Sequence, residues 1–230
     1  LRIRGKMKIM LGRVYSDLGP VVGQINGEDI HANQLERRGY DWENGYGTPS
    51  DGKDTNRDGQ PVRKLTKDAK SIIIFWSRSG STKLLASKIA RETGADILEI
   101  TLKTLYPANY RKTLSRANRE RIQDAPPELA MQLPDLSQYD TIYLGYQTWA
   151  MTLSQPMKAF LLQYGGEFSN KKIAPFLSEG GYGTGDSIEL IREIIAQNGG
   201  KNNTYTSALV VDGNRVDESD AEVKRWLKNI

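Results

Sequence analysis

The fold is decided at residues 71–83, which read Ser71-Ile72-Ile73-Ile74-Phe75-Trp76-Ser77-Arg78-Ser79-Gly80-Ser81-Thr82-Lys83. The apolar first half predicts a buried strand, and it passes directly into a hydroxyl-rich turn before a helical pattern begins near Thr82. The first N–H groups of a helix have no partner within it, and the helix dipole makes that end partially positive. With added hydroxyl donors, this turn is suited to bind a phosphate, mainly through neutral groups.

The turn favours the phosphate of a mononucleotide. It lacks the spacing GxxxxGK[ST] of a nucleoside triphosphate site, and no GxGxxG follows a strand as in dinucleotide sites. Taken alone, the turn has an equally good alternative, because Ser and Thr are also the preferred caps of a helix N-terminus.

Two later loops also follow apolar strand patterns. Residues 146–151 come after 141–145, and residues 178–185 come after 172–177. Ligands of parallel sheets bind outside the carboxyl ends of strands where the winding reverses. We therefore expect the three loops to form one site.

The order and spacing of these loops, with Tyr106-Pro107 and Tyr110 after the second strand, resemble the flavodoxin-like FMN-binding proteins over residues 71–230. The resemblance implies an α/β three-layer sandwich around a five-stranded parallel sheet in the order 2-1-3-4-5, with FMN as cofactor. It places the FMN phosphate at the first loop and the ribityl chain and isoalloxazine at the other two. The implied cofactor-binding residues are Ser77, Arg78, Ser79, Gly80, Ser81, Thr82, Tyr146, Gln147, Thr148, Trp149, Ala150, Ser178, Glu179, Gly180, Gly181, Tyr182 and Gly183.

The residue types fit a flavin. Its ring is flat and apolar along one edge, so Trp149 or Tyr182 offers a suitable aromatic face. Its pyrimidine edge needs hydrogen-bond partners, and the backbone at Gly180, Gly181 and Gly183 can approach it closely.

Three positions depart from what is common in this group, namely Gln147, Ala150 and Met151. Flavodoxins often have Gly beside the flavin, so that a peptide can flip on reduction. A Cβ makes a positive φ costlier. We expect Ala150 to hinder that flip and reduction to approach a two-electron step.

The chain divides by composition near residue 70. Residues 71–230 alternate strand and helix patterns and form the predicted flavodoxin-like domain, whereas residues 1–70 are a polar N-terminal extension or leader. We expect a strand or helix at 7–14 and a hairpin through Asn-Gly at 24–30 in the leader. The later strands are predicted at 96–102, 139–146, 172–177 and 204–211, and the last helix at 217–229.

One leader segment has a metal-binding alternative. Residues 54–59 open like a calcium loop, but the twelfth position is Leu65 rather than a bidentate Glu, so a turn-rich loop is the better reading and no metal site is assigned.

The composition excludes several kinds of cysteine- and histidine-based site. The chain has no cysteine and only one histidine, His31, which excludes disulfides, thiolate ligands and a multi-histidine metal site. We assign no catalytic residue, because redox chemistry would come from the cofactor.

No stretch is long and apolar enough to span a membrane. We expect a cytoplasmic protein, or an extracytoplasmic one if a targeting or anchoring segment was removed before Leu1.

A basic run raises the question of a nucleic-acid partner. The net charge is +4, and a basic run occurs at residues 111–121. No RNA- or DNA-binding motif accompanies that run, so a solvated helix face is the better interpretation.

Three functions stay open. An electron carrier would exchange electrons with redox partner proteins. An enzyme such as an NAD(P)H-dependent FMN quinone reductase would leave room over the flavin for substrates. A flavin-free domain of the same fold would bind a protein. The absence of a second nucleotide motif favours the carrier or a small flavoprotein of another class.

Overall fold

The computed structural model describes residues 21–25, 28–31, 61–107 and 110–230. Its centre is a parallel sheet in which β6 (Thr141–Trp149) lies between β4 (Ser71–Phe75) and β8 (Lys172–Glu179). Outside these lie β5 (Asp96–Glu99), next to β4, and β10 (Leu209–Asp212), next to β8. When these five strands are numbered by their order along the chain, they lie side by side in the order 2-1-3-4-5.

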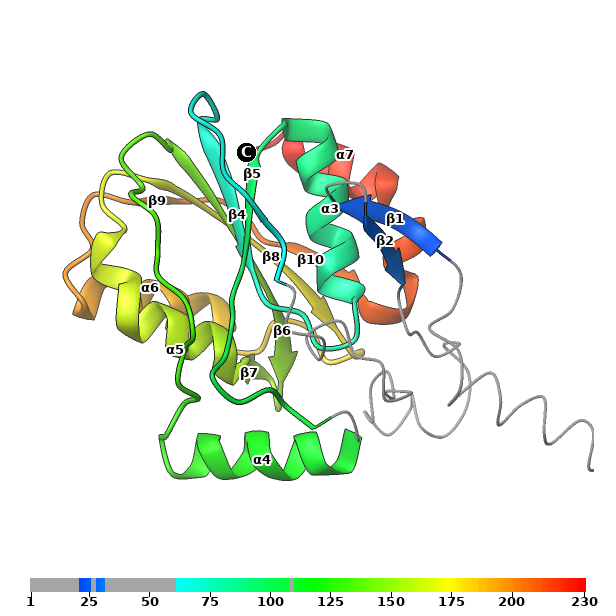
Figure 1. The fold of residues 1–230 in the computed structure, drawn as a ribbon, viewed down its shortest axis with the longest axis vertical. Helices are drawn as coiled ribbons and strands as arrows, with labels where there is room; N and C mark the ends of the chain where they lie inside the picture. Colours follow the sequence, from blue (N-terminus) through cyan, green and yellow to red (C-terminus); the bar gives the residue numbers. More distant parts are fainter. Residues whose placement is uncertain (1–20, 26–27, 32–60, 108–109) are drawn as a thin grey trace, which may run out of the picture.

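Helices cover both faces of the sheet, as Figure 1 shows. One face is covered by α5 (Gln155–Tyr164) and α6 (Ser187–Gln197), the other by α3 (Ser81–Thr93) and α7 (Asp220–Leu227). Successive residues of β4 point to opposite faces, so Ile72 and Ile74 join the first core while Ile73 and Phe75 join the second. A strand buried on both sides needs the unbroken apolar run that this sequence has.

Short strands enlarge the predicted five-stranded sheet. β3 (Arg63–Lys64) pairs antiparallel with β5, and β9 (Thr204–Tyr205) pairs with β8. Beside β3, the Val62 N–H donates to Glu99 Oε2 at 2.9 Å, and the Glu99 N–H donates to the Val62 carbonyl at 2.9 Å. Residues before position 70 therefore extend one edge of the sheet.

The predicted hairpin in the leader is confirmed, with β1 (Val21–Ile25) antiparallel to β2 (Glu28–His31). Ile25 is buried in the core on the α3 side. A domain division at residue 70 stays a prediction. Residues 7–14, the turn at 26–27 and the calcium-like segment 54–59 lie outside the described residues.

Several predicted strand boundaries were wrong. The strand expected at 139–146 spans residues 141–149, and the one expected at 172–177 extends to Glu179. The strand expected at 96–102 ends at Glu99, and the one expected at 204–211 is divided into β9 and β10. In the segment between β9 and β10, the Ser207 carbonyl accepts a hydrogen bond from Trp226 Nε1 at 2.8 Å. This carbonyl is therefore not paired with a neighbouring strand. The last helix, α7, begins at Asp220 after the 3₁₀ turn η2 (Gly213–Glu218); another 3₁₀ turn, η1 (Gly165–Glu167), follows α5.

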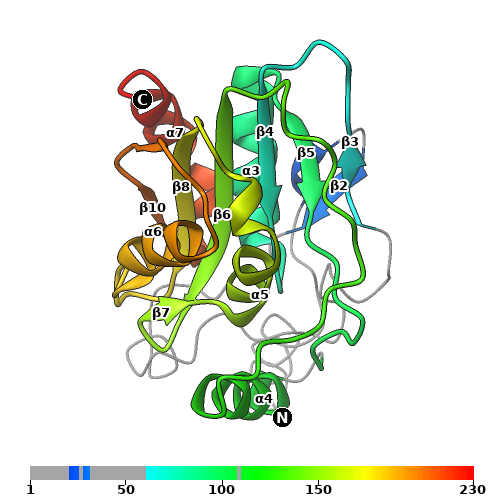
Figure 2. The same ribbon diagram turned by 90° about the vertical axis from the view of Figure 1, so that its left-hand side faces the viewer.

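Helix α4 (Tyr110–Ile122) stands apart from the two helical layers. In Figures 1 and 2 it lies beyond the carboxyl end of the sheet, where β6 turns into β7 (Thr152–Leu153). α4 thus covers the edge of the sheet where parallel folds bind ligands.

Among the described residues, no helix combines the length and apolar character that crossing a membrane requires.

Candidate functional site

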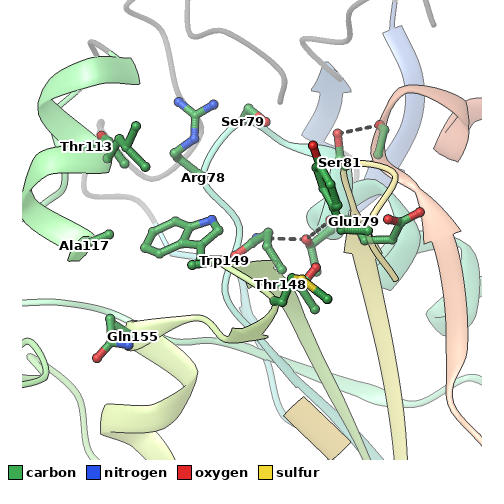
Figure 3. Close-up of a pocket in the computed structure, with 18 of the residues that line it drawn as sticks. Arg78, Ser79, Ser81, Thr113, Ala117, Thr148, Trp149, Gln155 and Glu179 are labelled. Carbon is green, nitrogen blue, oxygen red and sulfur yellow. Dashed lines mark hydrogen bonds between the residues drawn. The ribbon is translucent and has the colours of Figure 1, made fainter. Parts of the chain in front are cut away.

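A cavity of about 440 Å³ lies at the carboxyl end of the sheet, between the three predicted loops and α4 (Figure 3). This volume is within the range typical of small-molecule sites. Most predicted site residues line it. They are Ser77, Arg78, Ser79, Ser81, Thr82, Gln147, Thr148, Trp149, Ala150, Ser178, Glu179, Gly180 and Tyr182.

Four predicted site residues do not line the cavity, namely Gly80, Tyr146, Gly181 and Gly183. Tyr146 belongs to β6 rather than to a loop, and its side chain is buried in the core on the α5–α6 side. Its hydroxyl hydrogen-bonds Ser187 Oγ at 3.0 Å, and burial raises the pKa of this phenol above its ordinary value.

The sequence did not predict that α4 lines the cavity. Thr113, Leu114, Ala117, Asn118 and Arg121 line the cavity from α4, and their spacing puts them on adjoining parts of one helix surface. The spacing was visible in the sequence, but the position of α4 over the strand ends depends on tertiary packing. Three other residues were also missed, namely Met151, Gln155 and Gly213.

The first loop presents the N-terminus of α3 to the cavity. Gly80 is the cap, with φ of 101°, and the Leu84 N–H donates to its carbonyl at 2.8 Å. The preceding N–H groups of Ser81, Thr82 and Lys83 have no partner within the helix. A residue with a Cβ would be strained at the conformation of Gly80.

The hydroxyls of this loop are used differently from what we expected. Thr82 Oγ1 accepts from Gln147 Nε2 at 2.8 Å and hydrogen-bonds Ser178 Oγ at 2.9 Å, so it ties the start of α3 to the carboxyl ends of β6 and β8. Ser81 Oγ donates to the Gly213 carbonyl at 2.9 Å. These two groups mainly hold the site together, whereas the Ser79 hydroxyl has no partner among the described residues.

Arg78 also changes the expected electrostatics of the first loop. Its side chain lines the cavity and is 6% exposed. The loop therefore contributes a positive charge to the site in addition to its neutral donors, which favours an anionic ligand.

Two glutamines leave buried oxygens beside the cavity. Gln147 Nε2 also donates to the Trp76 carbonyl at 2.8 Å, and because that carbonyl can only accept, the orientation of the amide follows. Gln147 Oε1 is then buried without a partner among the described residues, as is Gln155 Oε1. An unpaired buried acceptor is costly, so both positions favour a ligand that donates hydrogen bonds.

Trp149 lines the cavity and packs against two further aromatic rings behind it. The Trp149 ring lies edge to face with Trp76, at a centroid distance of 5.3 Å, and with Tyr106, at 5.2 Å. Trp149 is only partly buried and lines the cavity, while Tyr182 lines it with 56% of its surface exposed.

α4 is fixed beside these rings by Arg116. Its guanidinium lies 4.0 Å from the Tyr106 ring centroid, and its Nε donates to Glu120 Oε1 at 2.6 Å. The Tyr106 hydroxyl donates to the other Glu120 oxygen. Burial, and then the bond to Glu120, raise the pKa of Tyr106 above its ordinary value. From the same helix, Ala117 packs in the core that Trp149 adjoins (Figure 3).

The second loop is a two-residue hairpin turn between β6 and β7. Ala150 and Met151 have φ of 52° and 59°, the backbone of a type I′ turn. Ala150 thus adopts the positive φ that we expected its Cβ to disfavour. The turn is held from the third loop, because the Asp186 N–H donates to the Met151 carbonyl at 3.1 Å. Left-handed non-glycine residues cost about 1–3 kcal/mol each and cluster at functional sites.

The third loop folds around a carboxylate. Glu179 Oε2 accepts from the Gly181 N–H at 2.5 Å and the Gly183 N–H at 2.8 Å. These two donors, which we expected to face a ligand, are occupied within the loop.

The model of the flavodoxin family matches residues 70–230. The chain is also similar to the crystal structure of a candidate flavoprotein from Bacteroides uniformis, at 24% identity and a TM-score of 0.57, over 70% of this chain and 99% of that one. A flavoprotein in complex with FMN from Lactobacillus acidophilus is 24% identical with a TM-score of 0.53, over 69% of this chain and 99% of that one. At these identities the two structures support the fold alone. The family match, together with the sheet and the cavity, confirms the predicted family, and the chain belongs to the flavodoxin family.

Proposed function

We propose that the chain binds FMN in this cavity and transfers electrons through the bound flavin. The observation that carries the proposal is the meeting of a helix N-terminus, an aromatic face and unpaired acceptors in one cavity at the carboxyl end of the sheet. The family match and the likeness to a solved flavoprotein with FMN support the predicted cofactor.

The phosphate end would be held by the first loop. The N–H groups at the start of α3, the Ser79 hydroxyl and the Arg78 guanidinium are donors suited to a dianion. The engaged hydroxyls of Ser81 and Thr82 would keep this loop in shape.

The rest of FMN also matches the cavity. Trp149 and Tyr182 offer aromatic surface to a flat ring. Ribityl hydroxyls and the ring N–H are donors for Gln147 Oε1 and Gln155 Oε1. When bound, the flavin supplies the electron-transfer chemistry, and the protein supplies position and electrostatics.

An enzyme is the second candidate, because α4 adds a polar wall to the cavity. Thr113, Asn118 and Arg121 face it together with Gln155, which would suit a substrate held beside the flavin. An NAD(P)H-dependent quinone reductase is the corresponding activity, and steady-state oxidation of NAD(P)H with a quinone distinguishes it from a carrier.

The phosphate assignment is tested by replacing Ser79 with Ala. We expect the Kd for FMN to rise about tenfold to a hundredfold, because a hydrogen bond to a charged group contributes about 1.5–3 kcal/mol. The Kd for riboflavin, which lacks the phosphate, should stay within about twofold. Both are measured by quenching of flavin fluorescence.

Ser115→Ala on the exposed side of α4 is the matched control, and it should change neither Kd. Equal losses for FMN and riboflavin in Ser79→Ala would contradict the phosphate site. A wild-type protein that is colourless after purification and does not take up FMN would overturn the proposed function.

A further inference from the structure

One face of α4 lies open beside the mouth of the cavity. Its residues follow helical spacing, and Leu114 and Arg121 also line the cavity, as do Met151 and Tyr182 from the second and third loops. We call these residues the rim surface. Its members are Arg111, Leu114, Asn118, Arg121, Ile122, Met151 and Tyr182.

Large apolar side chains concentrate on this surface. Among the described residues, six large hydrophobic side chains are exposed, and four of them belong to the rim surface: Leu114 at 41%, Ile122 at 74%, Met151 at 56% and Tyr182 at 56%. Scattered exposed hydrophobic residues need no explanation, but a group around a cavity mouth indicates an interaction site.

The charge of the rim surface is positive. Arg111 and Arg121 have no ion-pair partner among the described residues, whereas the two acids nearest to Arg121 along the chain are paired with other cations. Glu120 pairs with Arg116 at 2.6 Å, and Asp124 pairs with Lys158 at 2.6 Å. Glu179 is the one carboxylate among the described residues that line the cavity, and it keeps its negative charge while it accepts hydrogen bonds from its own loop. Among the described residues, two arginines without an ion-pair partner thus stand against one carboxylate at the mouth, which leaves an excess of positive charge.

These features select one kind of occupant. Exposed apolar residues beside arginines suit a protein with an apolar contact patch framed by Asp and Glu. A second copy of this chain would bring the same positive surface and be repelled. Because the surface surrounds the cavity proposed for FMN, its partner would approach close to the flavin.

We infer that the rim surface docks an acidic redox protein, which exchanges electrons with the flavin at the cavity mouth. The inference rests on the proposed function and adds the chemistry of the partner.

The charge at the mouth is tested with two small oxidants of opposite charge. FMN-loaded protein is reduced with dithionite and mixed anaerobically with ferricyanide or hexaammineruthenium(III). Each ion takes one electron, so two ions are consumed per fully reduced flavin. We expect the ferricyanide rate constant to fall at least about threefold from low to high salt, and the hexaammineruthenium rate constant to rise, because salt screens attraction and repulsion alike.

Reversing the two arginine charges should reverse this pattern. In R111E/R121E, we expect the ferricyanide rate constant at low salt to drop about tenfold and that of hexaammineruthenium to increase. The matched control is R225E/K228E, at the carboxyl end of α7 on the far side of the molecule from α4 (Figure 2), which should stay within about twofold. FMN affinity is measured for each variant, and the salt dependence of the wild type stands even if a variant does not fold.

The class of partner is tested with macromolecules. Reduced protein should pass electrons to acidic cytochrome b5 faster at low salt than at high salt, and to basic cytochrome c in the opposite manner. Binding to phosphatidylcholine–phosphatidylserine vesicles is measured by sedimentation for the wild type and for R111E/R121E. We expect the wild type to show no vesicle binding that depends on the two arginines. Such binding would assign the surface to a membrane and overturn the protein partner.

The outcomes distinguish a failure of the docking inference from a failure of the proposed function. FMN binding with no salt dependence, or with ferricyanide rates that rise with salt, overturns the docking inference and leaves the proposed function in place. A wild-type protein that does not bind FMN overturns both.

Discussion

Gly185 lies against the turn that joins β6 and β7. A Cβ placed on it would be 1.7 Å from the Met151 carbonyl oxygen, and its φ is 51°. Gly185→Ala must push the third loop away from the turn, so we expect the free energy of unfolding to fall by about 2–4 kcal/mol, from overlap and backbone strain together. FMN affinity should fall with it, because this contact positions both loops. Urea denaturation and a flavin titration measure the two effects.

Gly183→Ala is the matched control at the same scale. Its φ is 73°, but nothing lies within 4 Å of its Cβ position. It should therefore lose only the backbone contribution, about 1–2 kcal/mol. Similar losses in the two variants would mean that the close approach of Gly185 to Met151 does not matter.

At the scale of elements, the position of α4 depends on Arg116. This side chain pairs with Glu120 and also donates to the carbonyls of Thr104 at 3.0 Å and Leu105 at 2.9 Å. In Arg116→Ala we expect faster amide hydrogen exchange confined to residues 110–122, and a loss of about 1–2 kcal/mol in the free energy of unfolding. Arg119→Ala, which removes a cation without a described partner from the same helix, should leave exchange unchanged. Unchanged exchange in both variants would show that α4 is held by other contacts.

At the scale of the whole molecule, the cavity joins segments from five regions of the chain, from the loop after β4 to Gly213. A ligand that binds only this assembled site stabilises the entire domain. At an FMN concentration about 100 times its Kd, the free energy of unfolding should rise by about 2.7 kcal/mol, and Tm by about 5–10 °C for a domain of this size. Calorimetry with FMN and with riboflavin at equal concentration measures this, and riboflavin should give the smaller shift. Equal shifts would argue against phosphate recognition.

Much of the fold followed from local pattern. The run at residues 72–75 is apolar throughout because β4 is buried on both faces, and the hydroxyl-rich loop with Gly80 follows because a helix must begin there. Repetition of strand, loop and helix then predicted parallel pairing, and therefore a site at the strand ends. These features depend on residues close in sequence.

Other features could only come from contacts between distant segments. Thr82 reads as a phosphate donor in sequence, but its hydroxyl is held by Gln147 and Ser178. Ala150 adopts a positive φ because Asp186 and the adjoining third loop hold the turn. By itself, the sequence determined the sheet, the helices and the loops that meet at its carboxyl end. Tertiary structure alone decided which donors remain for a ligand and that α4 closes the cavity, because both depend on pairings over long chain separations.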